Sequence, residues 1–559
     1  MVALQYHHAT KHHFNRFARS QGYLDWATQP DPFRRYAGAP VVALARDVVA
    51  GSPPYSALYD GHAAAQPIDD QSIAEFLRCS LGLSAWKQYR QSRWALRVNP
   101  SSGNLHPTEA YVVRDASVFH YAPREHALEH RATIERRAWD EFTRGHSGFL
   151  VALSSILWRE AWKYGERAFR YCQHDTGHAI AAMRIAASLL GWKLALLPRW
   201  SDSSLSTLLG LDRDSDYEGA EREEAECVAI VTSEDITPWL AADPAPLAAA
   251  ARDAVWTGRA NQLSPDHVPW PIIDQVSDAT RYPASTPNSA TPDSRLLPTP
   301  ESQLRGPSPD SQEARARDVI LQRRSAVAFD ARSGLSRERF VSMLARLRPG
   351  APPWDAIDWS PQVHLILFVH RIEGLTPGVY AYLRGPDVLD EWRAAMRPEF
   401  LWERPNDSNA SNAPNASNAP NDSNDSNGLF LLFPSDVMWT ANRISCDQDI
   451  AADGFFSLGM IARLESSLSA HGEWFYRRLF WECGMIGQVL YLEAEAAGAR
   501  GTGIGCFYDD AVHELLGMSD GSWQSLYHFS MGMPVDDPRL TTEPGYAWET
   551  ENGVGSHFS

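Results

Sequence analysis

The sequence predicts a globular chain built from two related halves, each with helices and strands, and three observations lead to this prediction. Of the 559 residues, 44% are hydrophobic, 11% aromatic and 21% charged, which is enough apolar material for large cores. A stretch crowded with Pro, Ser, Thr and Asp, from Ser264 to Ser311, has no sustained apolar period and separates the halves. Short motifs recur in the same order on both sides of it.

The clearest repeat is a pair of long helices, expected at residues 169–190 and 476–497. Apolar residues of the second helix recur at intervals of three and four, which is typical of a core helix. The first helix is richer in Ala and Gly, so we expect it to pack closely against a flat surface or another helix. The repeated positions are Asp175, Gly177 and Gly191 in the first half and Glu482, Gly484 and Gly498 in the second.

Two weaker repeats have the same order. SALYDG at 56–61 parallels SAVAFD at 325–330, and a helical pattern follows each. VFHYAPREHALE at 118–129 parallels GVYAYLRGPDVLD at 378–390, and both predict a strand, a turn and a second strand.

These repeats define the expected organisation: a first half at 1–258, a linker at 259–312 and a second half at 313–559. Residues 405–428 read PNDSNASNAPNASNAPNDSNDSNG, a low-complexity tract with little apolar surface to bury. We expect this tract to be a solvated insertion in the second half.

Charge and composition argue against several classes of protein. The formal net charge is −18, which would repel a phosphate backbone, so we expect no nucleic-acid partner. The first residues contain no apolar signal region, and Arg184 and Lys193 interrupt the most apolar stretch. We therefore expect a cytoplasmic protein without a membrane span. The six cysteines form no C-x-x-C pair, which favours reduced, packed thiols.

The strongest local signal for chemistry is the loop PSSGN, which precedes an apolar strand. Pro100, Ser101, Ser102, Gly103 and Asn104 offer hydroxyls, amides and a close backbone approach, which suit a phosphorylated ligand. The same residues are common turn formers, and composition alone favours a plain turn.

This loop, within NPSSGNLHPTE, resembles the flavin-binding loop of nitroreductases, and the whole chain resembles the SagB-type dehydrogenases of that superfamily. The resemblance implies an α+β fold, with helices around mixed or antiparallel sheets, duplicated in one chain as an intramolecular pseudo-dimer. It also implies FMN bound at the interface of the two units. The matching stretches occur in both halves, outside the two linkers: residues 6–40, WREAWKYGERAFRYCQHDTGH, and RRLFWECGMIGQVLYLEAEAAGARGTGIGCFYDD.

The second signal is LQRRSAVAFD, where Arg323, Arg324 and Ser325 end a helical run. Guanidinium groups bind phosphate bidentately, although a basic helix end in solvent is also common. By resemblance, Arg323 and Ser325 contact FMN. The chain departs from the family at Val327, where a third basic residue is often found.

The two halves lack complementary parts of such a site. Pro53 and Pro54 stand in the first half where the arginines would be, and the second half has no PSSGN loop. In nitroreductase dimers these two parts of one flavin site come from different subunits. The resemblance therefore implies one composite FMN site, with the pseudo-symmetric site lost.

Further site residues follow from the resemblance. Within GTGIGCF, a glycine-rich turn by default, the amides of Ile504 and Gly505 would approach flavin N5. Arg539 could reach the phosphate. Lys163 and Tyr164, which could equally be a solvated and a packed residue of an amphipathic helix, correspond to the Lys-Tyr pair of SagB-type azoline oxidases and would handle the substrate proton.

A metal site is the rival interpretation. His174 and His178 lie four residues apart on one expected helix, a spacing that can hold a metal. No cysteine or E-x-x-H partner stands near them, so hydrogen-bonded core or cofactor-wall histidines are favoured and we expect no metal.

Three functions remain open. The first is an FMN-dependent dehydrogenase of the SagB type that oxidises the azoline ring of a small-molecule or peptide substrate, with dioxygen or another acceptor reoxidising the flavin. The second is an NAD(P)H-dependent nitro- or quinone reductase. The third is a scaffold protein that has lost its flavin, which the Val327 departure alone would favour.

Overall fold

The computed structural model describes residues 1–47, 49, 51–61, 63–283, 313–385, 388–405, 428–518 and 520–551. The low-complexity tract and most of the expected linker therefore lie outside the described residues. The start of that linker is not irregular, because Pro271–Ala279 forms the helix α10 with three buried residues.

The first half is built on an eight-stranded antiparallel sheet in which β11-β7-β6-β5-β8-β10-β9 are neighbours and β2 pairs with β7. Every residue of β8 is buried, because the core lies on both faces of the sheet. The strands are β2 (Val41–Ala43), β5 (Thr108–Arg114), β6 (Ser117–Ala122), β7 (Ala127–Thr133), β8 (Phe149–Ser155), β9 (Lys193–Leu196), β10 (Glu224–Thr232) and β11 (Val255–Trp256).

The second half contains a six-stranded antiparallel sheet with the order β15-β14-β13-β16-β18-β17. Counted along the chain, this is the same order as β7-β6-β5-β8-β10-β9 of the first half, so the duplication is confirmed. The strands are β13 (Val363–Val369), β14 (Gly378–Tyr382), β15 (Leu429–Pro434), β16 (Phe456–Arg463), β17 (Arg500–Ile504) and β18 (Trp523–Gly532).

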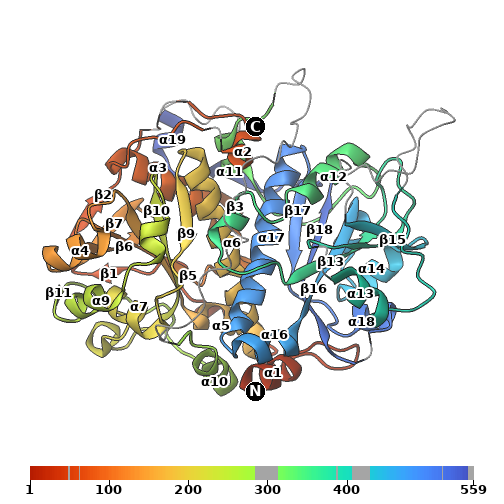
Figure 1. Cartoon of the computed structure of the whole chain (residues 1–559), viewed down its shortest axis with the longest axis horizontal. Coiled ribbons are helices and arrows are strands. Elements are labelled where there is room, and N and C mark those ends of the chain that lie inside the picture. Colours follow the sequence, from red (N-terminus) through yellow and green to blue (C-terminus); the bar gives the residue numbers. More distant parts are fainter. Residues whose placement is uncertain are drawn as a thin grey trace.

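Two long helices, α6 (Ala168–Leu189) and α17 (Phe475–Ala496), lie side by side between the sheets (Figure 1). The helix α6 lies between β8 and β9 along the chain and α17 lies between the corresponding strands β16 and β17, as the repeat predicts. A Cβ atom on Gly177 would overlap the backbone of Trp481, and one on Gly484 would overlap the backbone of His174. These two repeated glycines therefore allow the close helix crossing that joins the halves as an intramolecular pseudo-dimer.

The remaining helices surround the sheets and connect the strands. The predicted strand after β14 is wrong, because residues 389–395 form a helix instead. The α-helices are α1 (Val2–Ala9), α2 (Ala57–Asp60), α3 (Asp70–Ser80), α4 (Arg136–Thr143), α5 (Leu157–Tyr164), α7 (Asp202–Leu209), α8 (Thr237–Leu240), α9 (Ala245–Arg252), α11 (Ala316–Gln322), α12 (Arg337–Ala345), α13 (Leu389–Ala395), α14 (Met438–Ile444), α15 (Ile450–Asp453), α16 (Leu464–His471), α18 (Ala511–Leu516) and α19 (Trp548–Glu551).

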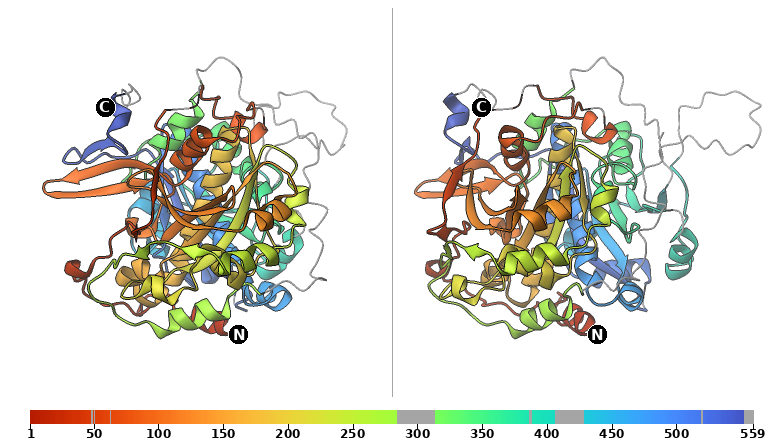
Figure 2. Two further views of the ribbon diagram at one scale, coloured as in Figure 1. Left: turned by 90° about the vertical axis from the view of Figure 1, so that its left-hand side faces the viewer. Right: turned by 60° about the vertical axis from the view of Figure 1, so that its left-hand side comes forward.

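The C-terminal segment returns to the first half. The strand β19 (Thr541–Pro544) pairs with the hairpin of β3 (Leu83–Tyr89) and β4 (Ser92–Arg97), which projects from the body of the molecule (Figure 2). A further small sheet pairs β1 (Tyr36–Ala37) with β12 (Arg259–Ala260).

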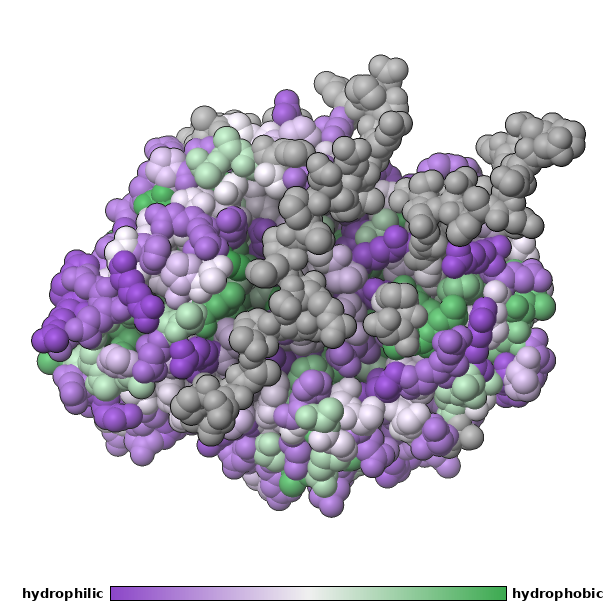
Figure 3. Space-filling model, in the orientation of Figure 1, coloured by the Kyte–Doolittle hydropathy of each residue, from purple (hydrophilic) through white to green (hydrophobic). Residues whose placement is uncertain are grey.

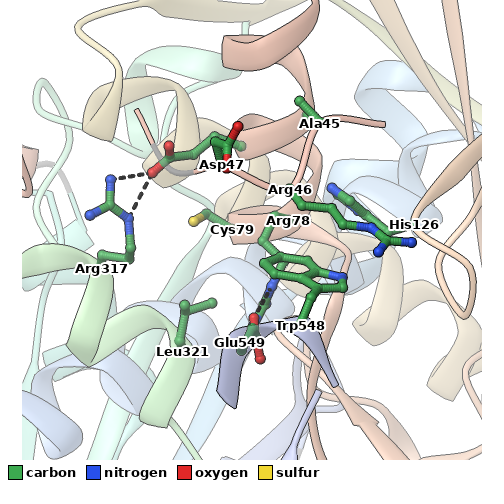
Figure 4. Close-up of a pocket in the computed structure, with 12 residues that line it drawn as sticks. Ala45, Arg46, Asp47, Arg78, Cys79, His126, Arg317, Leu321, Trp548 and Glu549 are labelled. Atoms are coloured by element: carbon green, nitrogen blue, oxygen red, sulfur yellow. Dashed lines mark hydrogen bonds and ion pairs between the residues drawn. The ribbon is translucent and has the colours of Figure 1, made fainter. Parts of the chain in front are cut away.

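Buried ion pairs connect segments far apart in the sequence. Arg78 of α3 pairs with Glu549 (Figure 4), and Arg317 of α11 pairs with Glu75 of α3. The cavity beside them has a volume of about 30 Å³, room for one water molecule. These pairs therefore hold the halves and the C-terminal segment together.

The molecular face in Figure 3 is largely hydrophilic, with small hydrophobic areas. Within the described part of the chain, no helix is both long enough and apolar enough to cross a membrane.

Candidate functional site

A cavity of about 390 Å³ opens between the halves, a size typical of small-molecule sites. Its walls come from β4 and the loop after it, from α6, from the segment after α11 and from β17. Six residues predicted to bind the cofactor line this one cavity: Pro100, Ser101, Ser102 and Asn104 of the first half, and Arg323 and Ser325 of the second.

The conformation of the PSSGN loop explains its composition. Gly103 and Asn104 have φ values of +59° and +60°, which glycine and asparagine adopt at the lowest cost. Asn104 Nδ2 donates to the Ala95 carbonyl at 2.9 Å, and Asn104 Oδ1 lies 2.9 Å from His106 Nε2. Because the asparagine side chain is used to fix the turn, the backbone and the two serines remain to face the cavity.

Lys163 and Tyr164, at the end of α5 (Leu157–Tyr164), lie beside this loop. A Cβ on Gly103 would lie 2.6 Å from Tyr164 Oη and 2.9 Å from Lys163 Nζ. Burial, and next the charge of Glu160, raise the pKa of Tyr164 well above its usual value. Tyr164 is therefore suited to donate a hydrogen bond as a neutral phenol rather than to act as a base.

Two buried carboxyl groups lie on the same side of the loop. Ser102 N donates to Asp175 Oδ1 at 3.2 Å, and Ser101 Oγ donates to Glu160 Oε1 at 3.4 Å. Asp175 Oδ2 and Glu160 Oε2 have no hydrogen-bond partner among the described residues. Burial raises the pKa of Asp175 to about 7, and burial together with the charge of Asp175 raises that of Glu160. Asp175 lines the cavity, so it can exchange a proton there near neutral pH.

The opposite wall carries positive charge. Arg323, Arg324 and Lys87 line the cavity. The two arginines are buried and form no ion pair with a carboxylate of the described residues, whereas Lys87 is half-buried and its Nζ donates to Thr542 Oγ1 at 2.6 Å. Arg323 donates to the Arg97 carbonyl at 2.9 Å, but its buried Nε has no partner. Burial lowers the pKa of Arg323, and burial with the charge of Arg323 lowers that of Arg324 to about 9. Two buried arginines without a carboxylate partner favour an anionic ligand such as a phosphate.

Strand β17 forms the wall beside Ser325. Ser325 Oγ donates to Tyr491 Oη at 3.1 Å, and Gly503 N donates to the same oxygen at 2.8 Å. Thr502 and Gly503 line the cavity, whereas the side chain of Ile504 points into the core of the second half.

Two other predicted cofactor residues lie outside the cavity lining. The Gly505 carbonyl accepts hydrogen bonds from Tyr171 Oη at 3.1 Å and from Arg167 at 3.3 Å. The Arg539 side chain is 68% exposed and pairs with Asp537 at 2.6 Å.

At the pseudo-symmetric position, the carboxylate that corresponds to Asp175 is bound by groups of the second half. Glu482 is the counterpart of Asp175. Its Oε1 accepts hydrogen bonds from the backbone amides of Gln362 and Val363, each at 3.1 Å, and its carboxylate pairs with Arg384. The carboxylate of Glu482 is thus satisfied from within the second half, whereas Asp175 keeps an unpartnered oxygen.

The two helix histidines have different surroundings. His174 stacks on Tyr527 and lies 3.2 Å from the Leu526 carbonyl, and His178 lines the cavity 3.3 Å from Tyr527 Oη. The described ranges contain no group of three or more His, Cys, Asp or Glu side chains that could hold a metal ion.

Sequence reasoning did not assign a role to several residues of this site. Asp175 was visible only as a repeated position, and Glu160 only as a residue of a family motif. Their raised pKa values come from burial, which the sequence does not show. The adjacent Arg-Arg pair was a usable signal for Arg324. The alternation of side chains along β4, which places Trp94 and Leu96 at the cavity, was a second usable signal.

Comparisons with known proteins agree with this arrangement. The model of the nitroreductase family matches residues 62–220 and 320–533. A comparison with curated proteins finds no match.

Among solved structures, a protein from Anabaena variabilis assigned to the nitroreductases is 19% identical, with a TM-score of 0.66 over 96% of this chain and 99% of that one. It shows the same fold along the whole chain. A Ralstonia eutropha protein with the same assignment (14% identity, TM-score 0.27, 39% of this chain and 97% of that one) is a partial match. A chain of the E. coli microcin synthetase McbBCD complex is also a partial match, with 19% identity and a TM-score of 0.25 over 34% of this chain and 71% of that one. At these scores neither bears on function.

Proposed function

Because the chain belongs to the nitroreductase family, and is therefore an oxidoreductase, we propose that it binds one FMN in the cavity between its halves and acts as a dehydrogenase of the SagB type. The observation that supports this most directly is the composite cavity. The PSSGN loop of the first half and the arginines of the second face one space, although more than 200 residues separate Ser102 from Arg323.

The residues present fit a flavin mononucleotide. Arg323 and Arg324 offer unpaired guanidinium groups to a phosphate, and Lys87 adds a third cation. Ser101, Ser102 and the exposed loop backbone offer hydrogen bonds to a polar ring edge. When bound, FMN supplies a hydride acceptor at N5. Ile504, Gly505 and Arg539 remain predicted cofactor residues from the family resemblance.

Proton transfer is assigned to three residues beside the PSSGN loop: Lys163, Tyr164 and Asp175. Lys163 Nζ stands beside Gly103, where it can take the proton that leaves a substrate carbon as the hydride departs. Tyr164 donates a hydrogen bond, and Asp175 passes the proton onward near pH 7. Oxidation of the azoline ring of a small-molecule or peptide substrate needs this combination of base and hydride acceptor, with dioxygen as terminal oxidant in a cytoplasmic setting.

An anaerobic spectrum of the purified protein tests the proposal. We expect flavin absorbance bands that persist when NADH or NADPH is added without dioxygen. Rapid bleaching by either nucleotide would support an NAD(P)H-dependent nitro- or quinone reductase instead. A protein that stays colourless after incubation with FMN would support the flavin-free scaffold.

A further inference from the structure

Cys446 and Cys506, 60 residues apart in the sequence, meet at the edge of the second half. Their sulfur atoms lie 2.9 Å apart, close to the bonded distance of about 2.05 Å in a disulfide. Both side chains are half-buried, whereas the other four cysteines are buried. Small reagents can therefore reach this pair while the remaining thiols are protected.

The backbone fixes the two cysteines relative to each other. Gln448 Nε2 donates to the carbonyl oxygens of Ser445 at 2.7 Å and Cys506 at 2.9 Å. Tyr508 N donates to the Ile444 carbonyl at 2.9 Å. The turn after α14 and the segment after β17 are thus held together by hydrogen bonds that do not involve the thiols.

The surroundings distinguish the two sulfurs. The hydrogen bond with Cys446 lowers the pKa of the Cys506 thiol, and His12 and Arg167 lower it further, while the same hydrogen bond raises the pKa of Cys446. His12 Nδ1 accepts from Ala18 N at 3.0 Å, which places the proton of the neutral ring on Nε2. These surroundings favour Cys506 as the thiolate that attacks first and Cys446 as the thiol that follows it.

We propose that Cys446 and Cys506 form a thiol–disulfide exchange site whose oxidant is a low-molecular-weight disulfide such as oxidised glutathione. The Cys506 thiolate attacks one sulfur of glutathione disulfide, the S–S bond breaks, and one glutathione thiolate leaves. Cys446 then attacks Cys506 Sγ and expels the second glutathione, and the proton of Cys446 goes to a leaving thiolate. The net reaction converts one protein dithiol and one glutathione disulfide into one protein disulfide and two glutathione thiols.

Neither cysteine lines the cavity. In the sequence, Gly505, whose carbonyl accepts a hydrogen bond from Tyr171 Oη, stands between Cys506 and the cavity residues Thr502 and Gly503. The disulfide would connect the end of β17 to the end of α14. The proposal does not rest on flavin binding, so the protein can be tested with or without FMN.

The test is to incubate the full-length protein with oxidised glutathione, block free thiols, and map disulfides in a digest by mass spectrometry. We expect a Cys446–Cys506 cross-link in nearly all molecules, while Cys79, Cys172, Cys227 and Cys483 stay unmodified. Added dithiothreitol should restore both thiols.

Single variants test the order of attack. Cys446→Ser should stop at a glutathione mixed disulfide on Cys506, and Cys506→Ser should leave Cys446 at least tenfold less modified. The cross-link in the wild-type protein does not depend on how the variants fold. A wild-type protein that keeps both thiols free, or that stops at a mixed disulfide without the cross-link, would overturn the proposal.

Discussion

Arg323 is the residue on which phosphate binding in the composite cavity should depend most. Arg323→Ala removes a buried, unpaired guanidinium, so we expect FMN affinity to fall about 30-fold, equivalent to about 2 kcal/mol. Titration of FMN fluorescence measures this. Lys163→Ala is the control, because Lys163 is proposed to act on the substrate proton, and it should bind FMN as the wild type does. If Arg323→Ala kept wild-type affinity while Lys163→Ala lost it, both roles would be wrong.

Val327 allows a test in which a cation is added to the cavity lining rather than removed from it. Its side chain is 76% exposed, so a longer polar residue fits without repacking. Val327→Arg adds a cation facing the proposed phosphate, and we expect FMN to bind about three- to tenfold more tightly at low salt. The control is Val255→Arg on β11, where an exposed valine lies outside the cavity lining. Equal effects of the two changes would show that only net charge matters.

Asp175 should make stability depend on pH. Its pKa is raised to about 7 by burial, so the folded state binds a proton that the unfolded chain releases near pH 4. The stability from the neutral carboxyl is complete below about pH 4 and is lost as the pH rises through about 7.

Asp175→Asn keeps a neutral group of similar shape, so this pH-dependent part should disappear. We expect the difference in unfolding free energy between wild type and variant to change by at least about 1 kcal/mol between pH 4 and pH 8, in favour of the variant at the higher pH. Urea titrations at several pH values measure it. Parallel pH profiles for the two proteins would contradict a raised pKa at this carboxyl.

The crossing of α6 and α17 is the element on which the pairing of the halves depends. Gly177→Ala would place a methyl group against the Trp481 backbone, which cannot move without shifting α17. We expect a loss of about 1–3 kcal/mol, although alanine is the better helix former. Thermal unfolding measures the loss. Gly385→Ala is the control, because a Cβ there meets nothing within 4 Å. A Gly177→Ala protein as stable as this control would mean that the crossing is looser than the structure shows.

At the level of elements, the sequence predicted the parts whose periodicity is strong. The long helices at 168–189 and 475–496 form within one residue of the expected positions, and β6 and β7 form the expected hairpin, with β7 extending to residue 133. The second strand expected within 378–390 failed because residues 389–395 form a helix that packs Trp392 into the core. The helix α10 escaped prediction because it is short and follows a Pro-rich segment.

The residues of the candidate site also fall into those that the sequence predicts and those that it does not. The loop at 100–104 and the arginines at 323–324 were predictable because motifs carry them. The roles of Glu160 and Asp175 were not, since a carboxyl acquires a raised pKa only from burial that the fold creates. Nor does spacing in the sequence show that Cys446 and Cys506 meet, because two segments of different elements bring them together.

For the molecule as a whole, duplication has produced two unequal positions. One lies between the PSSGN loop and the arginines and remains open, with an unpartnered Asp175 oxygen. At the other, Glu482 is bound by Arg384 and by backbone amides. The same order of strands thus carries one open site and one position whose carboxylate is already bound within its own half, which a symmetric dimer of identical subunits could not have.

The number of flavins bound per chain tests this account most directly. The protein is saturated with FMN, freed of unbound flavin, and assayed for flavin by absorbance after denaturation and for protein by amino-acid analysis. The composite site predicts one FMN per polypeptide of 559 residues. Two per chain would show that the pseudo-symmetric position also binds flavin, and none would show that the cavity between the halves is not a flavin site.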